Sequence, residues 1–197
     1  MSDNPLFLCG NTAAQVKEMG YAFYFKYVVE EDLDLLLKIN TIGFDFYEKL
    51  PLEERLSYSM SYDFKLRNND NKTILINQKI TPLFLNEEGK VWKAMCLISL
   101  SNEQESGNIK IFQQGGDKMM RYDLEGDYWR TEDKVALTTR EKEILQYSVR
   151  GFKINEIAES IFVSPDTVKF HRKKLFEKLE VTNITEAIAC ATNNKLI

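Results

Sequence analysis

Basic side chains gather near the end of the chain, in a segment whose residue types suit contact with nucleic acid. No acidic residue occurs between Asp166 and Glu177, and four cations lie in that interval: Lys169, Arg172, Lys173 and Lys174. Apolar residues recur there at helical spacing, so the segment predicts a helix with one apolar stripe and a basic outer face. Lysine and arginine neutralise phosphates and hydrogen-bond to base edges, and such a helix fits the major groove of DNA. For an isolated basic helix, the alternative interpretation is a solvated charged face.

Helix signals upstream make this segment the third helix of a compact domain. Thr138, followed three residues later by Glu141, has the spacing of a capping box that opens a first helix, and Gly151 supplies the left-handed residue that ends it. A second, short apolar helix follows. Ser164 is a suitable N-cap for the third helix, with Pro165 at its first position, where a missing N–H costs nothing. Two helices therefore precede the basic helix and position it.

These motifs resemble the LuxR-type helix-turn-helix, the DNA-binding domain shared by quorum-sensing regulators, sporulation regulators and NarL-like response regulators. The resemblance begins at Leu137, and the residues that carry it fall in short stretches. They are Leu137-Thr138-x-Arg140-Glu141-x-Glu143-Ile144-Leu145, Gly151, Glu156-Ile157-Ala158, Ser164-x-x-Thr167-Val168-Lys169-x-His171 and Lys178-Leu179-x-Val181. The resemblance implies an all-α domain of four helices that binds DNA.

The resemblance also assigns roles to individual positions. In the family the third helix is the recognition helix, and a fourth helix, here about Ile184 to Asn193, mediates dimerisation. By position, Lys169, Phe170 and Lys173 face base edges, and Lys174, in place of a frequent Asn, adds charge toward DNA. The residues that the resemblance places near phosphates are Ser164, Thr167, Arg172 and Lys178. Phe170 has two interpretations, contact with a thymine methyl group or packing in the core.

Other positions of the motif are interpreted as structural or depart from the family. The family often has Ser or Thr two residues after the glycine, where this chain has Lys153, so the sequence does not indicate how the second helix is capped. Glu180 replaces a frequent Gly and removes a preferred left-handed residue at the end of the recognition helix. His171 is interpreted as a packing and hydrogen-bonding residue, and Glu141 and Glu156 as cap or salt-bridge residues.

Composition and charge set the broad class of the protein. The 197 residues include 26 Lys+Arg and 30 Asp+Glu, a formal net charge of −4, and 44% are hydrophobic, so we expect a globular chain with a substantial core. Ten of the basic and eight of the acidic residues lie in 137–197, which gives that segment a charge of +2 and the remainder −6. The acidity of the whole chain therefore does not argue against a nucleic-acid partner.

Cysteine and histidine counts limit the chemistry further. Cys9, Cys96 and Cys190 form no C-x-x-C pair and indicate buried thiols in a reducing compartment. The one histidine, His171, leaves no multi-histidine metal site, and neither a metal nor a catalytic function is expected. No stretch of the sequence is long and apolar enough for a membrane span and no signal segment opens it, so a cytoplasmic location is expected.

The chain before the helical domain predicts a mixed fold, so the whole protein is expected to be α+β. Helices are expected at Thr12–Met19 and Glu31–Leu50, followed by strands joined by Asn- and Gly-containing turns, which specify an antiparallel meander. Three strands are expected at Met60–Arg67, Thr73–Thr81 and Val91–Leu100, with a weaker pair at Ile109–Phe112 and Met119–Trp129. The expected division is a first domain at 1–130, a linker at 131–136 and the helix-turn-helix domain at 137–197.

Helices followed by a meander resemble a PAS domain, with Glu30-Glu31-Asp32-Leu33 at the place of a common Pro-Glu-Asp motif. A PAS sheet has two strands before its helices, whereas only Pro5–Cys9 precedes them here. Either the first strand is missing, or the segment Ile109–Trp129 compensates, or the chain begins inside a longer protein. We favour a PAS-like domain that lacks its first strand. The resemblance implies a sensing or interaction domain.

No cofactor is expected in the PAS-like domain. The first 170 residues hold no histidine, which excludes histidine-ligated haem, and neither cysteine there lies in the Asn-Cys-Arg context of flavin adduct chemistry. An unknown small apolar ligand stays open, because an aromatic cluster can line a pocket, form a plain core or present a partner surface. The members of this cluster are Tyr21, Phe23, Tyr24, Phe25 and Tyr27.

The residues and resemblances together predict a two-domain bacterial transcription factor, controlled by a signal or partner at its PAS-like domain. The expected partners are double-stranded DNA and a second copy of the chain, because a homodimer reads a two-fold-related site. RNA polymerase and an unknown small ligand are further candidate partners, and no membrane is expected. The alternative is a protein-interaction adaptor whose PAS-like domain is a constitutive dimerisation module.

Overall fold

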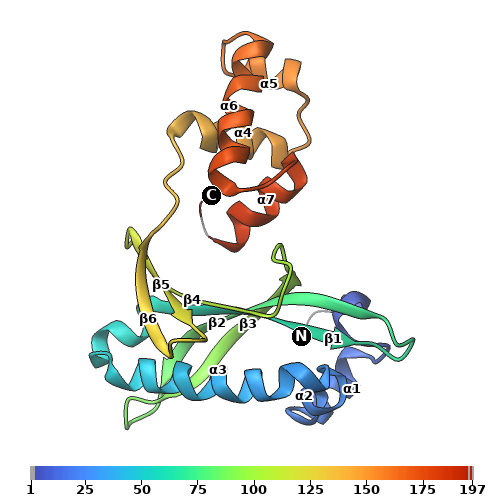
Figure 1. The fold of residues 1–197 in the computed structure, drawn as a ribbon, viewed down its shortest axis with the longest axis vertical. Coiled ribbons are helices and arrows are strands. Elements are labelled where there is room, and N and C mark those ends of the chain that lie inside the picture. Colours follow the sequence, from blue (N-terminus) through green and yellow to red (C-terminus); the bar gives the residue numbers. More distant parts are fainter. Residues whose placement is uncertain (1–2, 195, 197) are drawn as a thin grey trace. The chain divides into compact units, whose positions relative to one another are not determined.

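The computed structural model describes residues 3–194 and 196, which form two compact units, Met1–Asp133 and Lys134–Ile197 (Figure 1). In the first unit, helices come before strands. The helices are α1 (Ala13–Met19), α2 (Ala22–Tyr27) and α3 (Glu30–Lys49), with 3₁₀ turns at Pro5–Phe7 and Leu52–Ser57. The strands are β1 (Tyr58–Arg67), β2 (Thr73–Leu85), β3 (Val91–Leu100), β4 (Gly107–Gln113), β5 (Lys118–Asp123) and β6 (Tyr128–Asp133).

All six strands belong to one antiparallel sheet in the order β3-β2-β1-β4-β5-β6. The expected meander β1-β2-β3 is confirmed, and the weaker pair is three strands rather than two. Asn68 explains the sharp reversal between β1 and β2, because its side-chain oxygen accepts hydrogen bonds from the backbone N–H groups of Asp70 and Lys72 at 3.0 and 2.9 Å. Asn86 does the same between β2 and β3.

The order of elements differs from that of a PAS domain. Pro5–Phe7, the start of the only segment that precedes the helices, is a 3₁₀ turn and not a strand, since Asn4 caps it and Pro5 fixes its first dihedral angle. In the described part of the chain every strand of the sheet follows α3. The first unit shares an antiparallel sheet flanked by helices with PAS domains. Its described residues, from Asp3 onward, do not form the two leading strands.

The expected linker is also shifted. Thr131, Glu132 and Asp133 complete β6, and the irregular segment between the units is 134–138. An edge strand often carries charged residues, as a linker does. For this reason the polar sequence at the end of β6 predicts a linker.

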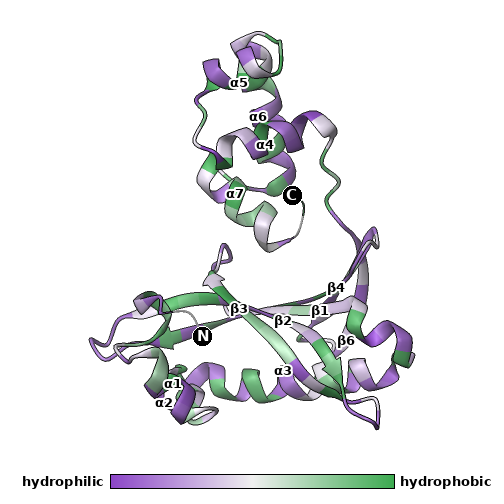
Figure 2. Ribbon diagram, turned by 180° about the vertical axis from the view of Figure 1, so that it is seen from behind, coloured by the Kyte–Doolittle hydropathy of each residue, from purple (hydrophilic) through white to green (hydrophobic). Residues whose placement is uncertain are grey.

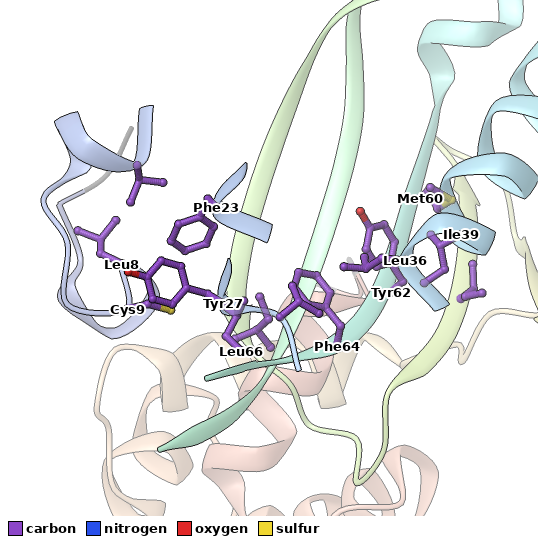
Figure 3. Close-up of a cluster of buried hydrophobic side chains, with 14 of the residues drawn as sticks. Leu8, Cys9, Phe23, Tyr27, Leu36, Ile39, Met60, Tyr62, Phe64 and Leu66 are labelled. Atoms are coloured by element: carbon purple, nitrogen blue, oxygen red, sulfur yellow. The ribbon is translucent and has the colours of Figure 1, made fainter. Parts of the chain in front are cut away.

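One face of the sheet packs against the helices and forms the core of the first unit (Figure 3). Met60, Tyr62, Phe64 and Leu66 alternate along β1 on that face, and none is more than 4% exposed. Gly43 lets α3 approach the sheet, because a Cβ at this position would lie 2.7 Å from Cε of Met60. Each fully buried side chain of this size contributes about 1.5–3 kcal/mol to folding.

The aromatic cluster of α2 divides between core and surface. Phe23 and Tyr27 are buried, with ring centroids 5.0 Å apart, and Tyr24 packs against Phe64. Tyr21 and Phe25 are 81% and 65% exposed. The plain-core interpretation therefore holds for one side of this helix, and the other side presents aromatic surface to solvent.

The second unit consists of four helices around two adjoining apolar clusters. The helices are α4 (Thr139–Val149), α5 (Ile154–Ser160), α6 (Pro165–Leu179) and α7 (Ile184–Asn193). Leu145 of α4 and Leu175 of α6 pack with Ala187 and Ala191 of α7, all fully buried. Ile144 of α4 lies in the second cluster with residues of α5 and α6. The four expected helices are confirmed.

None of the helices in the described ranges is both long and apolar enough to cross a membrane.

Candidate nucleic-acid interface

Helix α6 begins with a well-formed cap. The hydroxyl of Ser164 accepts a hydrogen bond from the backbone N–H of Thr167 at 3.1 Å, and Pro165 occupies the first turn. The two hydroxyls of Ser164 and Thr167 lie 2.8 Å apart. Asp166 places a negative charge in the same turn, where it favours the helix dipole. The start of α6 is therefore fixed before any partner binds.

The apolar stripe of α6 determines which residues face outward. Val168, Leu175 and Leu179 are 0%, 0% and 8% exposed and pack on the other helices. At 3.6 residues per turn, the opposite side of the helix is centred on Asp166, Phe170, Lys173 and Glu177 and flanked by Lys169 and Lys174. All six of these residues are exposed. The structure thus brings the three expected base-facing residues, Lys169, Phe170 and Lys173, onto one solvent-facing surface.

Phe170 is 54% exposed, so it is not part of the core. Its ring lies under the ammonium of Lys174, with Nζ 4.7 Å from the ring centroid, and is packed edge-on by His171 at 5.6 Å. A half-exposed aromatic ring beside cations is suited to apolar contact with a base. His171 therefore packs against the ring of Phe170.

The outward-facing lysines make only weak ion pairs. Nζ of Lys169 lies 2.9 Å from Oδ1 of Asp166, with side chains 61% and 88% exposed, and Nζ of Lys173 lies 3.9 Å from Oε1 of Glu177. Exposed pairs of this kind contribute about 0–1 kcal/mol. Both ammonium groups can therefore exchange these partners for phosphate or base acceptors at little cost. The spacings i,i+3 and i,i+4 already indicate such pairs in the sequence.

Two of the residues expected near phosphates are engaged within the domain. The guanidinium of Arg172 lies over the ring of Phe176, 5.6 Å from its centroid, and burial lowers its pKa. Nζ of Lys178 donates to Oε2 of Glu141 at 2.8 Å and to the carbonyl of Ala136 at 3.3 Å. Its partner comes from 37 residues earlier in the chain. No local pattern in the sequence signals this contact.

The helices that pack against α6 have defined ends of their own. The Thr138 hydroxyl accepts from the Glu141 N–H and the Glu141 carboxylate accepts from the Thr138 N–H, which is the expected capping box of α4. Gly151 ends that segment at φ +85°, as expected. The carboxylate of Glu156 accepts from the backbone N–H of Lys153 at 2.6 Å, which supplies a contact at the start of α5 that the sequence left open.

A helix, a tight turn and a longer helix with a basic exposed face define a helix-turn-helix protein of the DNA-binding kind. The sequence profile described as "Bacterial regulatory proteins, luxR family" matches residues 135–191. The probable csgAB operon transcriptional regulatory protein of Salmonella typhimurium is 30% identical over 158 residues, covering 75% of this chain and 72% of that protein. The chain belongs to the LuxR family of bacterial transcriptional regulators.

Two further comparisons concern parts of the chain. The CsgBAC operon transcriptional regulatory protein of Escherichia coli is 44% identical over 70 residues, 35% of this chain and 32% of that protein. A solved structure of the Vibrio cholerae VqmA dimer is 20% identical in sequence and has a TM-score of 0.31. The match covers 80% of this chain and 64% of the VqmA chain.

Proposed function

We propose that the protein binds operator DNA as a homodimer, with the exposed face of α6 in the major groove. Lys169, Phe170 and Lys173 contact base edges in this arrangement. Ser164, Thr167 and Lys174 lie beside phosphates, and Arg172 is held at the border of that surface by Phe176. The observation that carries the proposal is the exposed face itself, where three lysines and a half-exposed aromatic ring lie opposite the buried stripe of α6. Lysines on a fixed helix supply both phosphate neutralisation and hydrogen bonds to bases.

Lys178 has a different role in this proposal. Its ammonium is already paired with the carboxylate of Glu141, and the side chain of Glu141 is only 2% exposed. Leaving that carboxylate unpaired costs more than an exposed phosphate contact returns. Lys178 therefore positions α6 against α4, and its removal acts first on folding.

We further propose that the first unit receives the controlling signal or partner and that the protein has no catalytic function. The exposed aromatic side of α2, with Tyr21 and Phe25, supports a surface that responds to a ligand or to another protein.

Affinity measured as a function of salt tests the DNA-binding proposal. A preferred duplex is first selected from random sequence with the full chain, and its binding is followed by fluorescence anisotropy. Lys169→Ala and Lys173→Ala are each expected to weaken binding by about 1–3 kcal/mol and to relax base preference at one position per half-site. Lys49→Ala, which removes an exposed lysine of α3, is the matched control and is expected to bind as the parent does.

The salt dependence separates this function from that of a protein-docking adaptor. The association constant for binding through phosphates falls steeply with ionic strength. Each phosphate neutralised adds roughly −0.9 to the slope of its logarithm against the logarithm of the salt concentration, whereas docking through apolar surface has no such dependence. Unchanged affinity and unchanged salt slope in both α6 variants would show that α6 is not the recognition helix.

A further inference from the structure

The two edges of the sheet in the first unit differ in a way that the DNA-binding function does not require. The edge strand β6 is six residues long and carries Arg130, Glu132 and Asp133. The opposite edge strand, β3, is ten residues long and has Lys93 as its one charged residue. Figure 2 shows the contrast in hydropathy along the two strands. Charges and short length are how proteins prevent an edge strand from pairing with another chain, and β3 is long and has a single charge.

Apolar side chains are exposed on both faces of β3, although Lys93 and Ser99 share one face with Met95 and Leu97, and Ile98 on the other face is partly buried against the core. One face carries Ala94, Cys96, Ile98 and Leu100, which lie opposite the helix-facing residues of β2, and the other carries Met95 and Leu97. Trp92, Met95, Leu97 and Leu100 are 63%, 42%, 54% and 51% exposed. An edge strand with one solvated face usually carries polar residues on that face. The exposed apolar residues of β3 are instead typical of a strand that is covered on both faces.

The apolar surface around β3 lies at the upper end of what a monomer presents. The neighbouring residues Leu83 and Phe84 of β2 are 45% and 56% exposed, which extends the patch formed by the four exposed side chains of β3. If each half-exposed side chain presents roughly 100 Å², the six together present on the order of 600 Å², divided between the two faces of the sheet. The largest apolar patch of a typical monomer is about 300–600 Å², and a stable interface buries about 800 Å² from each partner.

We propose that β3 pairs with β3 of a second copy of this chain, antiparallel and across a two-fold axis, to join the two sheets into one. This inference rests on the proposed homodimer and names its interface in the first unit. A two-fold axis perpendicular to the sheet keeps every side chain on its own face. Even-numbered residues of one copy therefore lie opposite even-numbered residues of the other, and odd opposite odd. Such a register is centred on one residue that lies opposite the same residue of the second copy.

The register centred on Cys96 fits the side chains best. It places Trp92 opposite Leu100, Ala94 opposite Ile98 and Met95 opposite Leu97, so that apolar side chains meet apolar ones and a small residue meets a large one. Lys93 lies opposite Ser99 in this register, and its ammonium rests 4.0 Å from the ring centroid of Trp92. The register centred on Met95 pairs as many residues but sets Lys93 against Leu97. Registers centred further along the strand pair fewer residues.

Sedimentation equilibrium of the full chain without DNA tests the interface. Leu97→Lys places a charge in the joined sheet and is expected to raise the dimer dissociation constant by about a hundredfold, since each dimer contains the substitution twice. Leu37→Lys is the matched control, because Leu37 of α3 is 55% exposed against 54% for Leu97, and the dimer is expected to persist. A dimer that resists Leu97→Lys, or a parent chain that is monomeric at high concentration, overturns the proposal.

Thiol cross-linking tests the register. With Cys190→Ser present throughout, diamide is expected to convert the dimer to a covalent dimer on a non-reducing gel through the exposed Cys96, and Cys96→Ser is expected to abolish it, because the remaining thiol, Cys9, is buried. Met95→Cys in the Cys96→Ser background is the control and is expected to cross-link much more slowly. Faster cross-linking through position 95 than through Cys96 overturns the register. These measurements use no DNA, so a failed interface is distinguishable from a failed recognition helix.

Discussion

The ammonium of Lys178, near the end of α6, lies 2.8 Å from Oε2 of Glu141 in the first turn of α4. The same carboxylate accepts a hydrogen bond from the backbone N–H of Thr138 at 2.8 Å. One buried carboxylate thus caps α4 and joins α6 to it. This contact links α6, which carries the proposed DNA-binding face, to α4.

Glu141→Gln is expected to destabilise the second unit by about 1–2 kcal/mol. Gln can still accept from the Thr138 N–H, so the loss is the charge that pairs with Lys178, whose side chain is 37% exposed and can be partly rehydrated. Both tryptophans, Trp92 and Trp129, lie in the first unit, so their fluorescence does not report the change. Hydrogen exchange of α4 and α6 amides measures it directly.

The control for this variant is Glu143→Gln, because Glu143 is 41% exposed on its side chain and pairs with Arg140 at the surface. Its expected cost is below about 0.5 kcal/mol. Equal protection loss in both variants would show that the Glu141 contact has no special role.

The same contact predicts a pH dependence. Burial alone would raise the pKa of Glu141, but hydrogen bonds from Lys178 and Thr138 outweigh burial, and the pKa lies below its ordinary value of 4.5. The unfolded chain therefore binds a proton at a higher pH than the folded chain does. The stabilisation is complete above the ordinary value and is lost as the pH falls through the folded value. Exchange protection of α4 measured between pH 7 and pH 3 should fall less in Glu141→Gln than in the parent.

Phe170→Ala is expected to weaken binding to the selected duplex by about 1 kcal/mol, or roughly fivefold, with the salt slope unchanged. The reason is that an apolar contact to a base releases no counterions. Phe162→Ala is the matched control, since Phe162 is 93% exposed in the turn before α6. A change in salt slope, or an equal loss in the control, would place Phe170 away from the bases.

Asp32→Ala is expected to destabilise the first unit by about 1–3 kcal/mol. Oδ2 of Asp32 accepts from the backbone N–H of Lys65 at 2.7 Å and from the Ser106 hydroxyl at 2.6 Å, and the residue is 6% exposed. Removal leaves those donors without an acceptor in a buried place. Asp34→Ala, an exposed position of the same helix, should cost little. Tryptophan fluorescence during urea unfolding reports this unit.

Local signals in the sequence predicted the local structure well. The caps formed by Thr138 and Ser164 and the left-handed Gly151 are properties of a few neighbouring residues, and the structure has all three. The exposed face of α6 followed from helical spacing for the same reason. The partners of Lys178 and Asp32 lie 37 and 33 or more residues away, so no spacing rule reveals them.

The topology of the first unit was less predictable. Each hairpin follows from its turn. The pairing of β1 with β4 places β1 inside the sheet, but β2 and β3 separate these two strands in the sequence, so no turn signals their pairing. The sequence of β6 has the polar composition of a linker because it forms a sheet edge. The last strand of the expected meander, β3, is mostly apolar and lies at the other edge of the sheet.

Glu180→Gly is expected to stabilise the second unit. Glu180 ends α6 in the left-handed conformation at φ +54°, ψ +42°, which costs a non-glycine residue about 1–2 kcal/mol. Glycine removes that cost but loses more entropy on folding, so the net gain is about 0.5–1 kcal/mol. Glu177→Gly is the opposite control, because Glu177 lies within the helix, where glycine costs about 1 kcal/mol. Hydrogen exchange of α6 should therefore slow in the first variant and quicken in the second; slower exchange in neither variant would mean that the end of α6 is not strained.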